Sequence, residues 1–305
     1  MVRKKLADGT VKEYRYDTYK KRELPKDTVA AIISAYQTSP KWRGLAAKTR
    51  AEYGRYLREL EASAGSMCAT DFRRRDAIGL RDWISERSGN GAANVAVTAF
   101  GALFSWAVDS EWIEHSPMAR VGKLPGGHIR AWSAEQASVA LSKLPEHLRR
   151  AVTFALYTGQ RRGDLCAMLW SAYSSSELRF RQQKTGEELV LPVHPELKRE
   201  MDTWERTAVT ILTNPQGRPW LENTLSKMLK REMGRIGFPP GLSLHGLRKL
   251  FAATIADGGG TTHQIAAGTG HRTLGMVALY TRSADQRRLG AEAVRLLPKF
   301  GKDGK

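Results

Sequence analysis

The chain has 305 residues and a mass of 34.0 kDa, enough for two domains of ordinary size. Its formal net charge is +18, from 49 Lys and Arg against 31 Asp and Glu, which favours a polyanionic partner over an unspecialised basic protein. Cys68 and Cys166 are the only cysteines, which excludes a disulfide framework or a thiolate metal cluster and indicates a reducing compartment. No stretch approaches the roughly 18 apolar residues of a membrane span, so we expect a soluble, unprocessed, cytoplasmic protein with no membrane partner.

Residues 1–22 alternate apolar and polar side chains around Asp8-Gly9, as at Val11, Tyr14 and Tyr16. Alternation around an Asp-Gly pair predicts a short hairpin. Its positive charge fits an arm that contacts DNA, but a basic disordered tail accounts for the same composition equally well.

Residues 23–116 show helical periodicity, with apolar side chains at three-to-four spacing in Val29-Ile32-Ile33-Tyr36 and again up to Ile113. The pattern predicts an all-α bundle of about four helices. Taken one by one, most of its lysines and arginines are expected to be ordinary solvent-exposed side chains. Taken together, they favour contact with a DNA backbone. The candidate DNA-binding residues are Lys41, Arg43, Lys48, Arg50, Arg73, Arg74 and Arg75.

Residues 117–131 interrupt both kinds of periodicity with proline and glycine, and we interpret them as the linker between domains. Ser133 and Gln136 then form a capping-box pattern at the start of a helix. Helical patterns fill most of the second domain, residues 132–283, and one more lies in the tail, residues 284–305. The second domain is therefore expected to be mainly α-helical.

A change of period follows Trp170. Leu178 and Phe180 alternate with polar residues before Lys184-Thr185-Gly186, and Leu189, Leu191 and Val193 alternate after it. This predicts a β-hairpin with a lysine at its tip. The fold class expected for the second domain is thus mainly α with a small β-sheet (α+β).

Several residues of the second domain fit the cleavage of a phosphodiester, which needs a nucleophile, charge stabilisation and a proton for the leaving oxygen. Arg161 and Arg248 can offer planar guanidinium forks to the phosphate. They would stabilise the transition state electrostatically. Lys184 could protonate the 5′-oxygen as a general acid, although a single lysine in a turn is usually only solvated.

Two histidines and a tyrosine complete the set. His245 lies three residues before Arg248, so a helix would present both on one face; alone, such a pair is more often a surface or capping pair. His271 follows Gly270 and could donate to a phosphate oxygen, although alone it is more often a structural residue at a helix start. Tyr280 is the candidate nucleophile: its ordinary pKa near ~10 requires help from neighbouring cations or a base.

These residues match a known family. Thr158-Gly159-x-Arg161-x-x-Asp164-Leu165, Lys184, His245-x-x-Arg248, Gly270-His271 and Tyr280 stand in the order and approximate spacing of the tyrosine recombinases, or phage integrases. The resemblance covers residues 130–283 by motif, and residues 25–115 more loosely as the helical core-binding domain. Each of these motifs is common by itself, but the complete set in this order is specific to the family.

The resemblance implies a site-specific DNA recombinase. Arg161, Arg248, Lys184, His245 and His271 would be catalytic, Tyr280 would form a 3′-phosphotyrosyl link with a free 5′-hydroxyl, and Asp164 would support the site from behind. No cofactor is implied, neither ATP nor metal, and the sequence has no Walker-type loop or metal-ligand cluster.

The family also implies an assembly. Its members close two domains around double-stranded DNA as a C-shaped clamp, and a homotetramer exchanges strands through a Holliday junction. An excisionase or a DNA-bending protein is a candidate partner. The apolar stripe Leu289, Val294, Leu296 and Leu297 in the tail could dock on a neighbouring protomer or equally on its own domain.

Four functions stay open. Integration or excision of a prophage or mobile element is preferred because the basic N-terminus adds DNA contact, and resolution of chromosome dimers is the alternative. A type IB topoisomerase shares the chemistry, but the motif at residues 158–165 favours a recombinase. A DNA-binding regulator without cleavage activity is the rival from another class.

Overall fold

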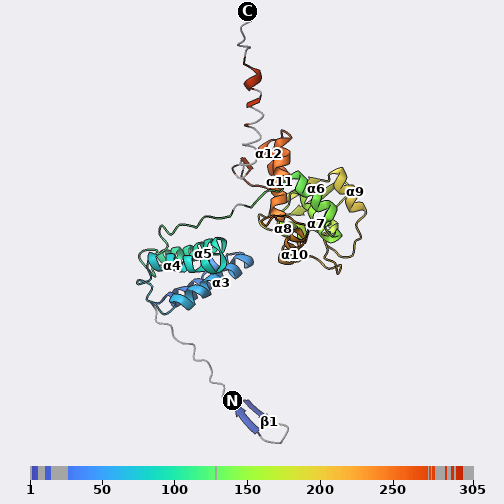
Figure 1. Ribbon diagram of the computed structural model, residues 1–305. Coiled ribbons are helices and arrows are strands. Elements are labelled where there is room, and N and C mark those ends of the chain that lie inside the picture. The colour runs from blue at the N-terminus through green and yellow to red at the C-terminus, as the bar shows by residue number, and fades with distance from the viewer. Residues whose placement is uncertain are drawn as a thin grey trace, which may run out of the picture. The chain divides into compact units, whose positions relative to one another are not determined.

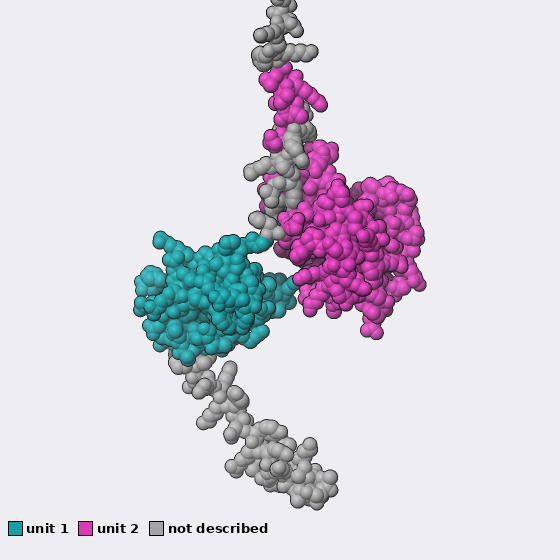
Figure 2. Space-filling view, viewed as in Figure 1, with its two compact units in different colours: residues 1–127 teal, residues 128–305 magenta. Residues whose placement is uncertain are grey.

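The computed structural model describes residues 2–5, 11–14, 27–127, 129–273, 275, 277–278, 286, 290–291 and 293–297, with the backbone alone in the first two ranges. The chain divides into two compact units, residues 1–127 and 128–305 (Figure 2). Each has its own cluster of buried apolar side chains. The division falls inside the segment predicted as a linker.

Unit 1 is a helical bundle, as its periodicity predicts. Four longer helices form, joined by one short helix between the first two. The Phe72 ring stacks on Phe104 in its core, with ring centroids 5.4 Å apart. The helices are α1 (Val29–Thr38), α2 (Pro40–Arg43), α3 (Ala47–Ala64), α4 (Arg74–Ser88) and α5 (Asn90–Asp109) (Figure 1).

Helix α5 is long and apolar enough to cross a membrane by length and composition. The expectation that no segment approaches this limit was therefore wrong. Eight of its residues are buried, among them Phe100, Leu103 and Phe104, and α1, α3 and α4 pack against it. A helix that is buried on most sides needs apolar residues around most of its circumference, so its composition follows from its central place in the bundle.

The chain after α5 is fastened to unit 1. Arg81 of α4 donates from Nη1 to the Gly122 carbonyl at 2.9 Å. The Asn94 amide of α5 donates to the Leu124 carbonyl at 2.9 Å and accepts from the Leu124 N–H at 2.8 Å. The first part of the predicted linker therefore runs along α4 and α5.

Unit 2 is mostly helical. The predicted capping box begins its first helix: Ser133 Oγ accepts from the Gln136 N–H at 3.1 Å, and Gln136 Oε1 accepts from the Ser133 N–H at 3.0 Å. The helices are α6 (Ala134–Lys143), α7 (Glu146–Thr158), α8 (Arg162–Ala167), the 3-10 helix η1 (Trp170–Ala172), α9 (Pro195–Asp202), α10 (Glu222–Arg235), α11 (Leu244–Asp257) and α12 (Thr262–Thr269).

Two antiparallel hairpins are present in the described part of the chain. In unit 2, β3 (Glu177–Arg181) pairs with β4 (Glu188–Pro192) in the register Glu177↔Pro192 to Arg181↔Glu188. In unit 1, β1 (Val2–Lys5) pairs with β2 (Val11–Tyr14). The mainly α fold with a small sheet is therefore confirmed. The C-shaped clamp concerns how the two units are arranged and stays a prediction.

The start of α11 is held by the chain that enters unit 2. Trp132 Nε1 donates to the Ser243 carbonyl at 2.9 Å. A Cβ at Gly246 would lie 2.4 Å from the Arg130 carbonyl oxygen, so a larger residue would push this segment away. The first turn of α11, which carries His245, is thus fixed by residues 130–132.

Candidate active site

The turn between α7 and α8 brings the two arginine motifs together. Helix α7 ends at Gly159, whose φ is +61°, and a Cβ there would lie 2.4 Å from Cδ1 of Phe251 on α11. Both the left-handed backbone and the close approach of α11 therefore require glycine. The Gly159 carbonyl accepts a hydrogen bond from Arg248 Nη1 at 2.8 Å, and Arg161 stands two residues further on, at the start of α8.

The Arg248 side chain is 2% exposed, and its guanidinium also contacts an imidazole. Arg248 Nη2 lies 3.0 Å from His271 Nε2. Because a guanidinium cannot accept, Nε2 accepts and the ring proton resides on Nδ1. Nδ1 then donates to Thr269 Oγ1 at 2.7 Å, and that hydroxyl donates to the Ile265 carbonyl at 2.5 Å. His271 is thereby fixed in one tautomer, just after the Gly270 cap of α12.

The surroundings keep both histidines neutral. Burial, and then the charges of Arg248 and Arg161, lower the pKa of His271 to about 4. Burial also lowers the pKa of His245, followed by its cationic neighbours, which include Arg248, Arg161 and Lys184. The predicted catalytic residues within the described chain therefore act on one another electrostatically, and both imidazoles are predominantly neutral at neutral pH.

Lys184 lies in the exposed turn between β3 and β4, as predicted. Asp164 of α8, 3% exposed, accepts a hydrogen bond through Oδ1 from the Gln183 N–H at 2.8 Å. Its Oδ2 is buried and has no hydrogen-bond partner among the described residues. Asp164 therefore fixes the backbone beside Lys184, which gives a physical basis for its expected supporting role.

Two fully buried glutamines, missed by sequence reasoning, join these parts. Gln182 Oε1 accepts from Arg161 Nη1 at 2.5 Å, and Gln182 Nε2 donates to Gln160 Oε1 at 2.8 Å. A signal was present: Leu178, Phe180 and Gln182 alternate onto one face of β3, so a glutamine occupies a position where the pattern calls for an apolar residue.

Tyr280, the predicted nucleophile, lies outside the described residues. So does Leu289 of the predicted apolar stripe in the tail. The remaining members of that stripe, Val294, Leu296 and Leu297, are exposed. Docking of the tail stays a prediction.

The predicted DNA-binding residues of unit 1 fall into two groups. Lys41, Arg43, Lys48 and Arg50 lie on α2 and the first turn of α3, while residues 73–75 lie at the start of α4, which follows the far end of α3. The two groups therefore lie on different elements, one on α2 and at the start of α3 and the other at the start of α4.

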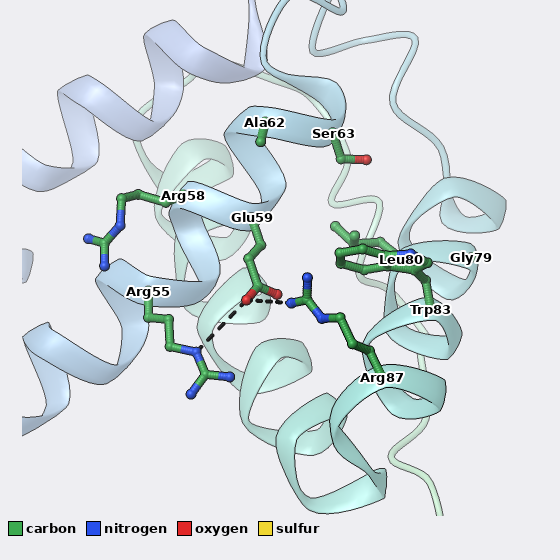
Figure 3. A pocket seen from close by; sticks show the side chains of 9 residues that line it. All are labelled: Arg55, Arg58, Glu59, Ala62, Ser63, Gly79, Leu80, Trp83 and Arg87. Carbon is green, nitrogen blue, oxygen red and sulfur yellow. Dashed lines mark ion pairs between the residues drawn. The ribbon is translucent and has the colours of Figure 1, made fainter.

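A pocket of about 640 Å³ lies between these groups, where α3 faces α4. Its Arg87 pairs with Glu59 at 2.7 Å and covers the Trp83 ring at 4.1 Å. Arg55 also pairs with Glu59, at 3.8 Å, whereas Arg58 points away from that carboxylate (Figure 3). Two of the three arginines that line the pocket are thus bound to one glutamate.

A mainly α fold with a small sheet and an arginine–histidine cluster is the arrangement that the resemblance to the tyrosine recombinases implies. Residues 131–287, just over half of the chain, match the model of the phage integrase family. The chain therefore belongs to the phage integrase family.

Phage integrases align with most of the chain or with about half of it. The integrase of Mycobacterium phage L5 is 25% identical over 312 residues, which cover 91% of this chain and 83% of that integrase. The integrase of Escherichia phage HK022 is 26% identical over 170 residues, 54% of this chain. Those residues span about half, 48%, of the HK022 integrase.

Solved structures share the fold. Lambda integrase, residues 75–356, solved as a dimer bound to a COC′ core site, superposes with a TM-score of 0.72 at 21% identity, covering 82% of this chain and 97% of that one. The Tn1549 transposon integrase in complex with transposon right end DNA gives 0.69 at 17% identity, covering 86% and 99%.

Proposed function

We propose that this protein cleaves and rejoins DNA at specific sites through a 3′-phosphotyrosine intermediate. One observation carries the proposal: four separate segments of the chain meet around the α7–α8 turn, and they carry Arg161, the Lys184 turn, His245 with Arg248, and His271. Family membership supports it.

The chemistry follows from the geometry. Tyr280 Oη would attack the scissile phosphorus while the bond from phosphorus to the 5′-oxygen breaks. His245, held neutral by burial and neighbouring charge, would take the phenolic proton, and Lys184 would give one to the departing 5′-oxygen. Reversal with a new 5′-hydroxyl would rejoin the strand, because the phosphotyrosyl bond conserves the energy.

Charge stabilisation would come from the two arginines. Arg161 and Arg248 are positioned by neutral groups, an amide oxygen, a carbonyl and an imidazole. An amide oxygen orients the Arg161 guanidinium without cancelling its charge, so Arg161 can stabilise the non-bridging oxygens as negative charge develops, and we assign the same role to Arg248.

Unit 1 would bind double-stranded DNA through its two cationic groups, the first on α2 and α3 and the second at the start of α4. Lambda integrase was solved as a tetramer bound to a Holliday junction, and we propose the same assembly here.

The cytoplasmic location, an excisionase or DNA-bending partner, and the N-terminal hairpin as a DNA-contacting arm belong to the same proposal. Mobile-element integration or excision is the preferred role over chromosome-dimer resolution, because the relatives above are integrases of phages and a transposon.

The test is a search for protein joined to the 3′ end of DNA. Nicked duplexes from a randomised library are incubated without metal with the wild type and with Tyr280→Phe, and adducts are separated on a denaturing gel. Adducts in the wild type alone are expected, and sequencing them gives the crossover site. If neither protein forms adducts while both bind DNA equally, the regulator is the better interpretation; relaxation of supercoils by a monomer would favour a topoisomerase.

A further inference from the structure

Gln182 lies at the junction of the segments that carry the predicted catalytic residues. It ends the inward face of β3 two residues before Lys184 and is 0% exposed. A Cβ at Gly270, the residue before His271, would lie 2.5 Å from Gln182 Nε2. The amide is therefore packed directly against the end of α12.

All four hydrogen-bonding positions of this amide are used. Oε1 accepts from Arg161 Nη1 at 2.5 Å and from Thr185 Oγ1 at 2.9 Å. Nε2 donates to the Thr269 carbonyl at 2.9 Å and to Gln160 Oε1 at 2.8 Å. Because a guanidinium can only donate, the oxygen must face Arg161, and this fixes the orientation of the amide.

Gln160 extends the same bridge. It is also 0% exposed, and its Nε2 donates to the Thr158 carbonyl at 2.7 Å and the Gly268 carbonyl at 2.9 Å. The two amides therefore connect the turn before Arg161 to the last residues of α12, which precede His271.

We propose that Gln182 is a positioning residue, whose neutral amide fixes the Arg161 guanidinium relative to His271 for the scissile phosphate. The inference rests on the proposed function. A carboxylate at this position would cancel the Arg161 charge and could not donate to the Thr269 carbonyl, and an apolar side chain would leave buried polar groups without partners. The amide supplies an acceptor and two donors without adding charge.

The experiment uses Gln182→Met, which keeps the length of the side chain and removes its hydrogen bonds. Gln183→Met is the matched control, because Gln183 is the exposed neighbour whose recorded bond to Asp164 uses only its backbone. Single-turnover adduct formation at saturating protein is measured on three forms of the recovered site: the natural phosphodiester, a methylphosphonate lacking one non-bridging charge, and a 5′-phosphorothiolate whose sulfur leaves without a proton.

On the phosphodiester, Gln182→Met should lower the rate about 10- to 100-fold, as expected for a misplaced catalytic group, with unchanged DNA affinity. The loss should shrink on the methylphosphonate, which depends less on Arg161, and persist on the phosphorothiolate. Gln183→Met should match the wild type on all three substrates.

Three results would overturn the assignment: an equal loss on all substrates, which marks a purely structural role; relief on the phosphorothiolate, which means that Gln182 serves Lys184; or no loss at all. If Gln182→Met does not fold, Gln160→Met is measured instead. It must show the same dependence of the rate loss on the substrate, with a smaller loss. A wild type that forms no adduct on any substrate would reject the proposed function itself, and this inference with it.

Discussion

Two ion-paired arginines of unit 1 and the two arginines of the candidate site differ in the kind of partner described for them. In unit 1, Arg87 binds the Glu59 carboxylate at 2.7 Å and Arg81 binds Asp82 at 2.7 Å. In unit 2, Arg161 donates to an amide oxygen and Arg248 to a carbonyl. Carboxylate partners neutralise a guanidinium, whereas neutral partners only orient it. We therefore expect the charge of Arg161 to act on a phosphate more strongly than the charges of Arg87 and Arg81.

The strongest test of this comparison is Arg161→Lys, which keeps the charge and removes the planar fork. We expect adduct formation to fall about 100- to 1,000-fold, the usual cost of losing one transition-state donor. The measurement is the single-turnover rate on the nicked site.

The matched control is Arg162→Lys on the same turn. Arg162 pairs with Glu222 at 3.1 Å and donates to Ser226 at 2.8 Å, and lysine can keep an ion pair there. A comparable loss in both variants would show that the turn, and not the Arg161 fork, limits cleavage.

Sequence reasoning reached the elements and the cluster because their signals are local or ordered along the chain. The capping box at Ser133, the alternation around Lys184 and the helical spacing of His245 and Arg248 each follow from backbone geometry. The site residues that were missed, Gln160 and Gln182, form hydrogen bonds with each other and with residues 268 and 269, which lie far away in the sequence. Their function depends on which segments pack together, and no local pattern encodes that.

The DNA contacts predicted for unit 1 stay a prediction. The sequence shows which cations lie on helix faces but not which of them meet a carboxylate from another helix, as Lys41 of α2 meets Asp109 of α5 at 3.1 Å. The high hydropathy of α5 was underestimated, because burial on most sides is a property of the bundle. The net charge could be predicted from the sequence, but which individual side chains are buried or paired could not.

Acid titration probes the neutral partners of Arg248. The folded pKa of His271, about 4, lies below the ordinary value near ~6.5, so the unfolded chain binds this proton first as pH falls. The stability contribution is full above pH ~6.5 and is lost as the pH approaches the folded pKa. Between pH 7 and 5 this group should cost at most about 2 kcal/mol.

The check is urea unfolding of the wild type and His271→Gln at both pH values. Glutamine can still accept from Arg248 but does not titrate, so the variant should lose less stability than the wild type between the two pH values. Parallel losses in the two proteins would mean that His271 does not titrate with folding.

The smallest expected effect is on the salt dependence of DNA binding by two arginines of unit 1. No described carboxylate forms an ion pair with Arg43, whereas Arg87 is bound to Glu59. If Arg43 contacts a phosphate, Arg43→Ala should reduce the slope of log Kd against log salt by about 1, because one fewer counterion is released. Arg87→Ala should leave the slope unchanged, since its charge is already compensated. Both slopes are measured by fluorescence anisotropy on the recovered site across a salt series. An equal change of slope in the two variants would contradict the prediction, because it would show that an arginine paired with a carboxylate still contacts DNA.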